Sequence, residues 1–224
     1  MKKILSTIFF VLSVGTLFAD SARPEILDRI RDYDLRHTDL LVKIVRDSET
    51  LRYAKVRALE KIAILYRQSK TEAEAVTPRL FEGIQAGLAH KAPDVREAAC
   101  NASVVFNESK IAPLLTNALA KTLKEETQPT VLYACAHTMR VFTKDTEAAV
   151  LAPALLAQVN RYLVTLLDDS KNEKALREIC LALGAAKDRK SFISLLKILQ
   201  SRYDESVKDA AQEALQAIRV PERK

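Results

Sequence analysis

The sequence predicts an all-α protein, an α-solenoid of about five helical hairpins. The chain of 224 residues contains only 4 glycines and no tryptophan, and 48% of its residues are hydrophobic. Few glycines and abundant Ala, Leu, Glu and Lys favour helices over strands and tight turns. One helical pattern of small and apolar residues also returns five times along the chain, which is typical of stacked helical repeats.

The pattern is clearest in residues 95–106, VREAACNASVVF, where small or apolar residues stand at offsets 0, 3, 4, 7, 8 and 11. These offsets form one face of an α-helix. The other segments that fit are LRYAKVRALEKI (51–62), VLYACAHTMRVF (131–142), LREICLALGAAK (176–187) and VKDAAQEALQAI (207–218). Only Lys55 and Lys187 depart from the pattern. The starts lie 44, 36, 45 and 31 residues apart, close to a hairpin repeat of about 40 residues.

Small residues at packing positions allow neighbouring helices to approach closely, as stacked hairpins require. A single hairpin cannot bury its apolar face alone, and stacking supplies a continuous core. An irregular helical bundle is the alternative architecture. Five segments with matching offsets favour the solenoid.

Bulkier amphipathic segments between the five stripes should form the first helix of each hairpin. They are residues 24–47 (one helix or two), 78–91, 111–125, 150–169 and 191–203. Thr77 and Pro78 predict the start of one of them, and Pro113 and Pro153 predict that two others begin near these prolines. The expected N-caps of the second helices are Ser48, Asp169 or Ser170, and Asp204.

Two segments carry a resemblance to a known family. APDVREAACNASVVF (92–106) and YDESVKDAAQEALQAI (203–218) resemble the second helices of HEAT repeats, particularly the bacterial HEAT-like class. In that class an acidic turn residue precedes Val-Arg or Val-Lys, Ala-Ala and Ala-Leu. The resemblance implies units at residues 26–68, 77–108, 109–143, 146–187 and 189–219, within a repeat domain at 20–224. Leu132, where Arg is usual, and Lys55, where a small residue is usual, depart from it.

Residues 1–19 have the layout of a secretory signal peptide, with Lys2 and Lys3, an apolar core over residues 4–18 and a small Ala19 before Asp20. An uncleaved anchor and a buried helix are the alternatives, but about 16 apolar positions fall short of the roughly 20 that a spanning helix needs. No cysteine follows the core, so a lipid anchor is not expected. We therefore expect a bacterial periplasmic or secreted protein.

Charge and cysteine content are less informative. Without residues 1–19, which hold two lysines and no acid, 33 basic and 29 acidic residues leave a net charge of +4, too small to indicate a polyanionic partner.

The three cysteines, Cys100, Cys135 and Cys180, cannot all pair within the chain, and their spacing matches no metal motif. Cys135 and Cys180 occupy offset 4 and Cys100 offset 5. We interpret all three as buried small hydrophobes, with catalysis or a disulfide as the alternatives.

A row of basic residues is the first candidate for partner binding. Offset 1 of the five stripes reads Arg52, Arg96, Leu132, Arg177 and Lys208. The resemblance implies that such a ladder lines the concave face, where it would contact an acidic partner or pair internally with turn residues. The candidate turn partners are Asp47, Asp94, Asp168 and Asp204. We favour internal pairing, because paired charges are common in repeats and Glu97, Glu178 and Asp209 neutralise much of the row. Charge reversal at Arg96 or Arg177 should then reduce the stability of the protein more than it reduces partner binding.

A second candidate is an aromatic and basic patch. Tyr53 and Tyr133 stand at offset 2, and His137 and Arg140 lie one and two turns beyond Tyr133. Tyr and Arg are enriched at protein interfaces. The full predicted partner-binding set is Arg52, Tyr53, Arg96, Tyr133, His137, Arg140, Arg177 and Lys208.

Enzyme functions are not favoured. His37, His90 and His137 lie in different segments without metal-type spacing, and the sequence has no G-x-S-x-G and no glycine-rich phosphate loop. We expect no catalytic residue, metal or cofactor. Nucleic-acid binding would require a strongly basic groove with interleaved aromatics, which the charge balance does not favour.

The expected function is therefore a non-catalytic scaffold in the cell envelope that binds a protein or peptide. The alternative is a structural subunit or assembly factor of a larger extracytoplasmic machine. An apolar terminal repeat would favour the subunit, and an apolar or charged concave stripe would favour the binding module.

Overall fold

The computed structural model describes residues 23–68, 70–142 and 145–219, and the predicted signal peptide lies outside them. These residues form α-helices, three short 3-10 helices and no strand, which confirms the all-helical prediction. The α-helices are α2 (Arg23–Asp32), α3 (Thr38–Arg46), α4 (Arg52–Gln68), α5 (Lys70–Leu88), α6 (Pro93–Ser103), α7 (Ala112–Glu125), α8 (Pro129–Val141), α9 (Asp145–Thr165), α10 (Ser170–Ala185), α11 (Phe192–Leu199) and α12 (Glu205–Arg219). The 3-10 helices are η1 (Leu35–His37), η2 (Val104–Phe106) and η3 (Arg189–Ser191).

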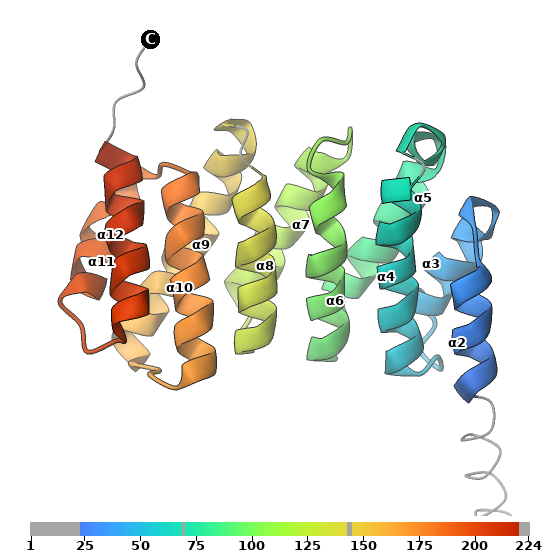
Figure 1. The fold of residues 1–224 in the computed structure, drawn as a ribbon, viewed down its shortest axis with the longest axis horizontal. Helices are drawn as coiled ribbons and strands as arrows, with labels where there is room; N and C mark the ends of the chain where they lie inside the picture. Colours follow the sequence, from blue (N-terminus) through green and yellow to red (C-terminus); the bar gives the residue numbers. More distant parts are fainter. Residues whose placement is uncertain (1–22, 69, 143–144, 220–224) are drawn as a thin grey trace, which may run out of the picture.

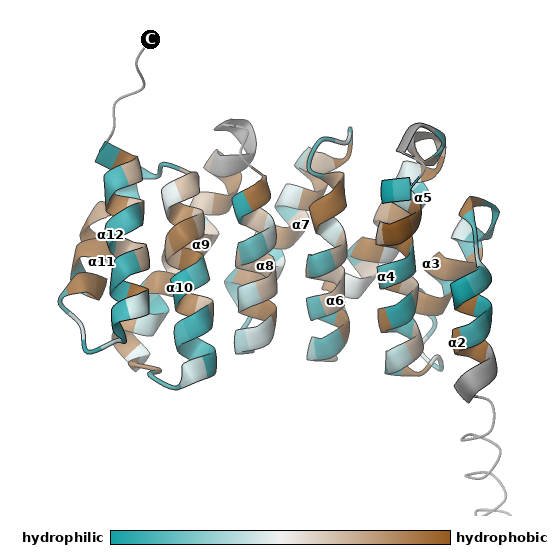
Figure 2. Cartoon of the chain, in the orientation of Figure 1, coloured by the Kyte–Doolittle hydropathy of each residue, from teal (hydrophilic) through white to brown (hydrophobic). Residues whose placement is uncertain are grey.

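The helices lie in two layers (Figure 1). Helices α4, α6, α8, α10 and α12 stand side by side in chain order and form what we call the even layer, and α2 stands next to α4 at its end. Helices α3, α5, α7, α9 and α11 form the odd layer behind it. In Figure 2 hydrophilic residues recur on the viewed side of α4, α6, α10 and α12. The hydrophobic core is one continuous cluster to which both layers contribute.

The predicted stripes form the packing face of the even layer. In α6 and the turn after it, all six pattern positions of residues 95–106 are buried, and so are the corresponding positions of α8 and α12. In residues 51–62 the first pattern residue, Leu51, is exposed because it lies just before α4 begins. The helical period therefore identified the core-facing side of these helices correctly.

The two lysines that interrupt the pattern have separate explanations. Lys55 is buried, and its ammonium group donates to the carbonyl oxygens of Val45 and Asp47 at the C-terminal end of α3. Those carbonyls carry the negative end of the helix dipole, which favours a cation there. Burial lowers the pKa of Lys55. Lys187 lies beyond the end of α10 with a left-handed backbone, at φ 50°, so it does not belong to the stripe.

Close helix approach depends on one glycine in particular. A Cβ atom added to Gly184 of α10 would lie 2.7 Å from the Cα and 3.0 Å from the Cβ of Ala214 in α12. The Cα is backbone, so a side chain at Gly184 would require the two helices to separate. The absence of a side chain sets the distance between the last two helices of the even layer.

Replacing Gly184 with valine should lower the free energy of unfolding by about 2 kcal/mol, because overpacking displaces α12 from α10. The matched control is Ala185→Val, one residue further along and exposed, which should cost less than about 1 kcal/mol. Urea unfolding followed by circular dichroism measures both. Equal losses in the two variants would contradict the close-approach argument.

Two predicted helix starts are wrong. Helix α5 begins at Lys70 and α9 at Asp145, so Pro78 and Pro153 lie inside these helices. Proline removes one backbone hydrogen bond, but residues before it are held by the core. Ala73 precedes Pro78 and is fully buried, and Leu151 and Ala152 are buried just before Pro153. By contrast, Pro113 lies in the first turn of α7, as predicted.

The cap predictions are partly confirmed. Asp169 caps α10 by accepting from the backbone N–H groups of Lys171 and Asn172, and Asp204 accepts from the N–H of Ser206 at 2.8 Å at the start of α12. Ser48 is not a cap, because α4 begins only at Arg52. Residues 24–47 contain parts of two α-helices, α2 and α3, separated by η1.

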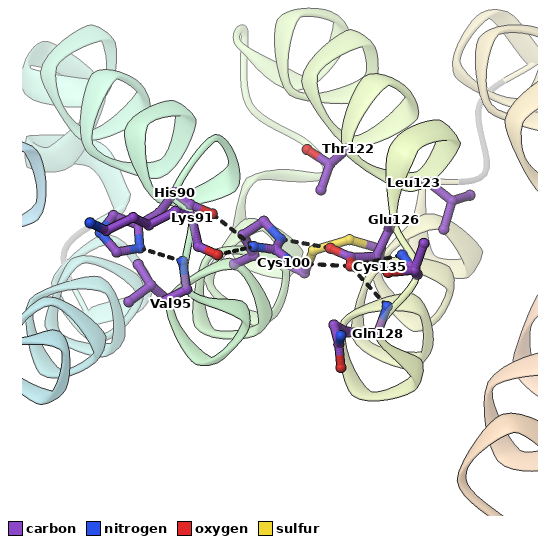
Figure 3. A network of polar contacts seen from close by, with 12 residues as sticks. His90, Lys91, Val95, Cys100, Thr122, Leu123, Glu126, Gln128 and Cys135 are labelled. Carbon is purple, nitrogen blue, oxygen red and sulfur yellow. Dashed lines mark hydrogen bonds and ion pairs between the residues drawn. A yellow bond between two sulfur atoms is a disulfide. The ribbon is translucent and has the colours of Figure 1, made fainter.

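The cysteine interpretation needs a correction. All three cysteines are fully buried, but Cys100 of α6 and Cys135 of α8 form a disulfide with a Cα–Cα distance of 5.0 Å (Figure 3). Packing of the neighbouring helices places offset 5 of the α6 stripe, Cys100, against offset 4 of the α8 stripe, Cys135. Cys180 is a free thiol, and burial raises its pKa to about 12. The disulfide covalently joins adjacent helices of the even layer.

No helix in the part of the chain that the structure describes has both the length and the apolar character to cross a membrane.

Candidate functional site

All eight predicted partner-binding residues lie on the even layer, but the structure gives them different environments. Arg52 and Tyr53 belong to α4, Arg96 to α6, Tyr133, His137 and Arg140 to α8, Arg177 to α10 and Lys208 to α12. Leu132, at the same offset as the basic row, is fully buried. The row is therefore interrupted at α8.

Arg96 is part of the internal structure. Its side chain is only 17% exposed, and its Nε and Nη2 donate to the two carboxylate oxygens of Glu126 at 2.6 and 3.0 Å. Its Nη1 donates to the carbonyl oxygens of His90 and Lys91, two residues that Figure 3 labels. Internal pairing was the favoured interpretation, but the partner is Glu126 in the turn between α7 and α8, and none of the four predicted aspartates.

Glu126 is held from several sides. Its side chain is 3% exposed and also accepts from the backbone N–H groups of Thr127 and Gln128, each at 2.9 Å. Burial by itself would raise the pKa of Glu126, but the hydrogen bonds from Arg96 and the two N–H groups outweigh it and hold the pKa below its ordinary value. The backbone carbonyl of Glu126 accepts from Gln158 and Arg161 of α9. This network links three successive hairpins.

A cleft of about 500 Å³ lies beside this network, lined by residues of α5 and α7 and by Arg96. His90 in its wall accepts from the N–H of Ala92 at 3.1 Å. Burial, together with the charge of Lys55, lowers the pKa of His90, so the ring is neutral near pH 7. The buried polar groups of this cleft are used in internal contacts, which gives it a structural role.

The other basic positions differ from Arg96. Arg52 lies 4.0 Å from Asp94, one of the predicted turn partners, and both side chains are exposed. Lys208 pairs with Glu205 of its own helix at 2.9 Å. Arg177 is exposed and makes no hydrogen bond or ion pair with another described residue. Internal pairing with a turn residue is therefore confirmed for Arg52 and Arg96 only, and only the pair of Arg96 is buried.

The aromatic and basic patch forms one contiguous group with a buried acid, which we call the α8–α10 cluster: Tyr133, His137, Arg140 and Glu178. The rings of Tyr133 and His137 stack with an interplanar angle of 7° and centroids 6.2 Å apart. Nδ1 of His137 lies 3.1 Å from Oε1 of Glu178, and Nε of Arg140 lies 3.3 Å from the same oxygen. Glu178 is buried, whereas the other three side chains are accessible.

This geometry indicates a recognition surface. The carboxylate of Glu178 fixes the imidazole of His137 and the guanidinium of Arg140, so less side-chain entropy is lost when a ligand binds. The guanidinium presents a planar set of donors that suits carboxylates. Arg177, which precedes Glu178 in the sequence of α10, is also exposed.

The helix period correctly predicted that Tyr133, His137 and Arg140 lie together, but the sequence pattern did not identify Glu178 as their anchor. At offset 2 of its stripe, Glu178 was expected only to neutralise part of the basic row. One sequence feature could have indicated this contact. Glu178 stands at offset 2 of the stripe in residues 176–187, and His137 and Arg140 lie in the preceding stripe, residues 131–142. Tyr53 does not join this cluster, since it lies on α4 and is partly buried against the core.

No protein-family model matches the chain, and comparisons with curated proteins and with solved structures find no match. Within the described residues, no group of three or more His, Cys, Asp and Glu side chains is placed to hold a metal ion.

Proposed function

We propose that this protein is an exported HEAT-like α-solenoid that binds a partner protein without catalysing a reaction. The observation that carries the proposal is the α8–α10 cluster, in which a buried Glu178 holds His137 and Arg140 beside an exposed Tyr133. Accessible Tyr and Arg side chains held by a buried anchor are typical of interface hot spots.

The architecture and the cysteines support this proposal. Five stripes with the same offsets pack side by side in chain order along the even layer, as the repeats of a solenoid do. The Cys100–Cys135 disulfide suits an oxidising compartment outside the cytoplasm, and the basic and apolar leader of residues 1–19 is consistent with export.

The chemistry of the cluster favours an acidic segment of the partner. Glu178 balances one positive charge, so Arg140 and the unpaired Arg177 together leave a net positive surface. A partner carboxylate would accept from the guanidinium groups, and an adjacent apolar side chain would pack on the exposed ring of Tyr133.

A second candidate function has one observation in its favour. The last hairpins expose Val164 of α9 at 81% and Ile193 of α11 at 60%. Apolar side chains on terminal repeats favour a subunit or assembly factor of a larger extracytoplasmic machine, which would cover them by contact with another component.

We expect Arg177→Glu and Tyr133→Ala to reduce partner capture from envelope extracts at least about tenfold, since hot-spot truncations often exceed that loss. Both positions are exposed, so melting temperatures should remain near wild type. The matched control is Lys124→Glu, an equal charge reversal on exposed α7. Quantitative mass spectrometry of cross-linked complexes measures capture. Undiminished capture by both variants would rule out the cluster, and a large loss of stability in Arg177→Glu would return this residue to an internal role.

A further inference from the structure

A groove runs between α4 and α6 on the even layer, away from the α8–α10 cluster. It encloses about 530 Å³, within the roughly 300–1,000 Å³ range typical of ligand sites. We call it the α4–α6 groove; its lining residues are Val56, Glu60, Ala63, Ile64, Asp94, Glu97, Ala98, Asn101 and Ala102. The lining contains three carboxylates and no Lys, Arg or His.

The floor of the groove is apolar. Ala63, Ala98 and Ala102 are small, so they leave room above the helix backbones, and Ile64 beside them is 45% exposed. An aliphatic side chain left in water is a favourable contact for a partner, because covering it removes apolar surface from solvent.

The rim carries negative charge that is available to a ligand. Glu97 makes no hydrogen bond or ion pair with another residue that the structure describes. Glu60 pairs with Arg57 at 2.7 Å and Asp94 lies 4.0 Å from Arg52, and all four of these side chains are well exposed. Such surface pairs are weak, so a cation on a partner can replace the arginine at little cost.

We propose that the α4–α6 groove binds a basic amphipathic helix of a partner protein. An amphipathic helix inserts its apolar face into a hydrophobic groove and places its charged face at the rim. Here the apolar face would cover Ile64, and lysines or arginines would meet Glu60, Asp94 and Glu97. The three lining carboxylates favour a basic segment over an acidic one in this groove, whereas the α8–α10 cluster favours an acidic one.

This inference goes beyond the proposed function, since it assigns a second surface with the opposite charge preference. The two surfaces lie on the same layer, on α4 and α6 and on α8 and α10 respectively. One protein molecule would therefore contact partner segments of opposite charge.

The test uses a labelled synthetic helix with the sequence LKKLLKLLKKLLKL and fluorescence anisotropy with the purified protein. We expect saturable binding, and no binding of the acidic analogue LEELLELLEELLEL. Glu97→Lys should weaken binding about tenfold, because it places like charges together. Glu97→Gln and Ile64→Ser should each weaken it about threefold, through loss of a rim charge or of apolar contact.

The matched control is Asp209→Lys, an equal charge reversal on exposed α12, where Asp209 has no hydrogen bond or ion pair with a described residue. It should change binding less than about twofold, since only long-range attraction is altered. Hydrogen exchange should show protection of α4 and α6 in the complex. Absence of saturable binding, equal effects of Glu97→Lys and Asp209→Lys, or protection confined to other helices would each overturn the proposal.

Two further measurements distinguish loss of peptide binding from loss of folding, and this groove from the α8–α10 cluster. Melting curves show whether Glu97→Lys unfolds the protein. If it does, the peptide affinities of Glu97→Gln and Ile64→Ser test the proposal instead. Arg177→Glu and Tyr133→Ala should bind the basic peptide as wild type does. A failure of the α8–α10 cluster to capture a partner would therefore leave this result unaffected.

Discussion

Replacing Arg96 with methionine is expected to lower the free energy of unfolding by about 3 kcal/mol, because it leaves the buried carboxylate of Glu126 without its cationic partner. Methionine retains an aliphatic stem, so the loss reports mainly on the guanidinium and its bonds to Glu126, His90 and Lys91. Urea unfolding at pH 7 followed by circular dichroism measures the change. The double variant Arg96→Met/Glu126→Gln should recover part of the loss, since no buried charge then remains unpaired.

The matched control is Arg52→Met at the equivalent offset of α4. Its ion pair with Asp94 is exposed, at 4.0 Å, so the variant should lose less than about 1 kcal/mol. If Arg52→Met and Arg96→Met destabilise the protein equally, the special role assigned to the buried pair is incorrect.

The buried pair of Arg96 and Glu126 also predicts a pH dependence of the free energy of unfolding. The pKa of Glu126 in the folded protein lies below its ordinary value of 4.5. A lowered carboxyl pKa stabilises the folded state above the unfolded pKa, and that contribution is lost as the pH falls below about 4.5. In Arg96→Met burial should instead raise the pKa of Glu126, so protonation relieves the buried charge. The stability difference between wild type and Arg96→Met should therefore begin to narrow above about pH 4.5, where Glu126 of the variant becomes protonated in the folded state, and should narrow further below about pH 4.5, where wild type loses its own contribution.

Removing the disulfide has the other large expected effect. The double variant Cys100→Ala/Cys135→Ala should lose about 4 kcal/mol, the loop-closure contribution for cysteines separated by 35 residues. The bond joins α6 to α8, so without it the unfolded chain gains freedom while the folded even layer keeps its packing. Urea unfolding without reductant measures the loss, and wild type with dithiothreitol should approach the stability of the double variant.

The control for the disulfide is Cys180→Ala, which removes a buried thiol that forms no disulfide and should cost about 1–2 kcal/mol through the small cavity. Thiol counting gives an independent test. Unfolded protein should show one reactive thiol without reductant and three after reduction. Three reactive thiols before reduction would show that Cys100 and Cys135 are not bonded.

The candidate site was only partly predictable. Tyr133, His137 and Arg140 follow each other at helical spacing, so their position on one face of α8 follows from the helix period. Their anchor Glu178 is 41 residues from His137 in the chain. Which residue of α10 faces α8 depends on how the two packed helices are rotated and shifted along their axes relative to each other. A local sequence pattern does not contain that information.

Local sequence patterns correctly predicted the all-helical class, the core-facing side of the even-layer helices and the caps at Asp169 and Asp204. These features depend on residues within a few turns of one another, where helix period and capping act directly. The pairing of Arg96 with Glu126, the disulfide between Cys100 and Cys135 and the position of Pro78 within a helix became visible only in the packed fold. Each of these depends on burial and on contacts between helices, whose energies outweigh local preferences but appear only once the helices are packed.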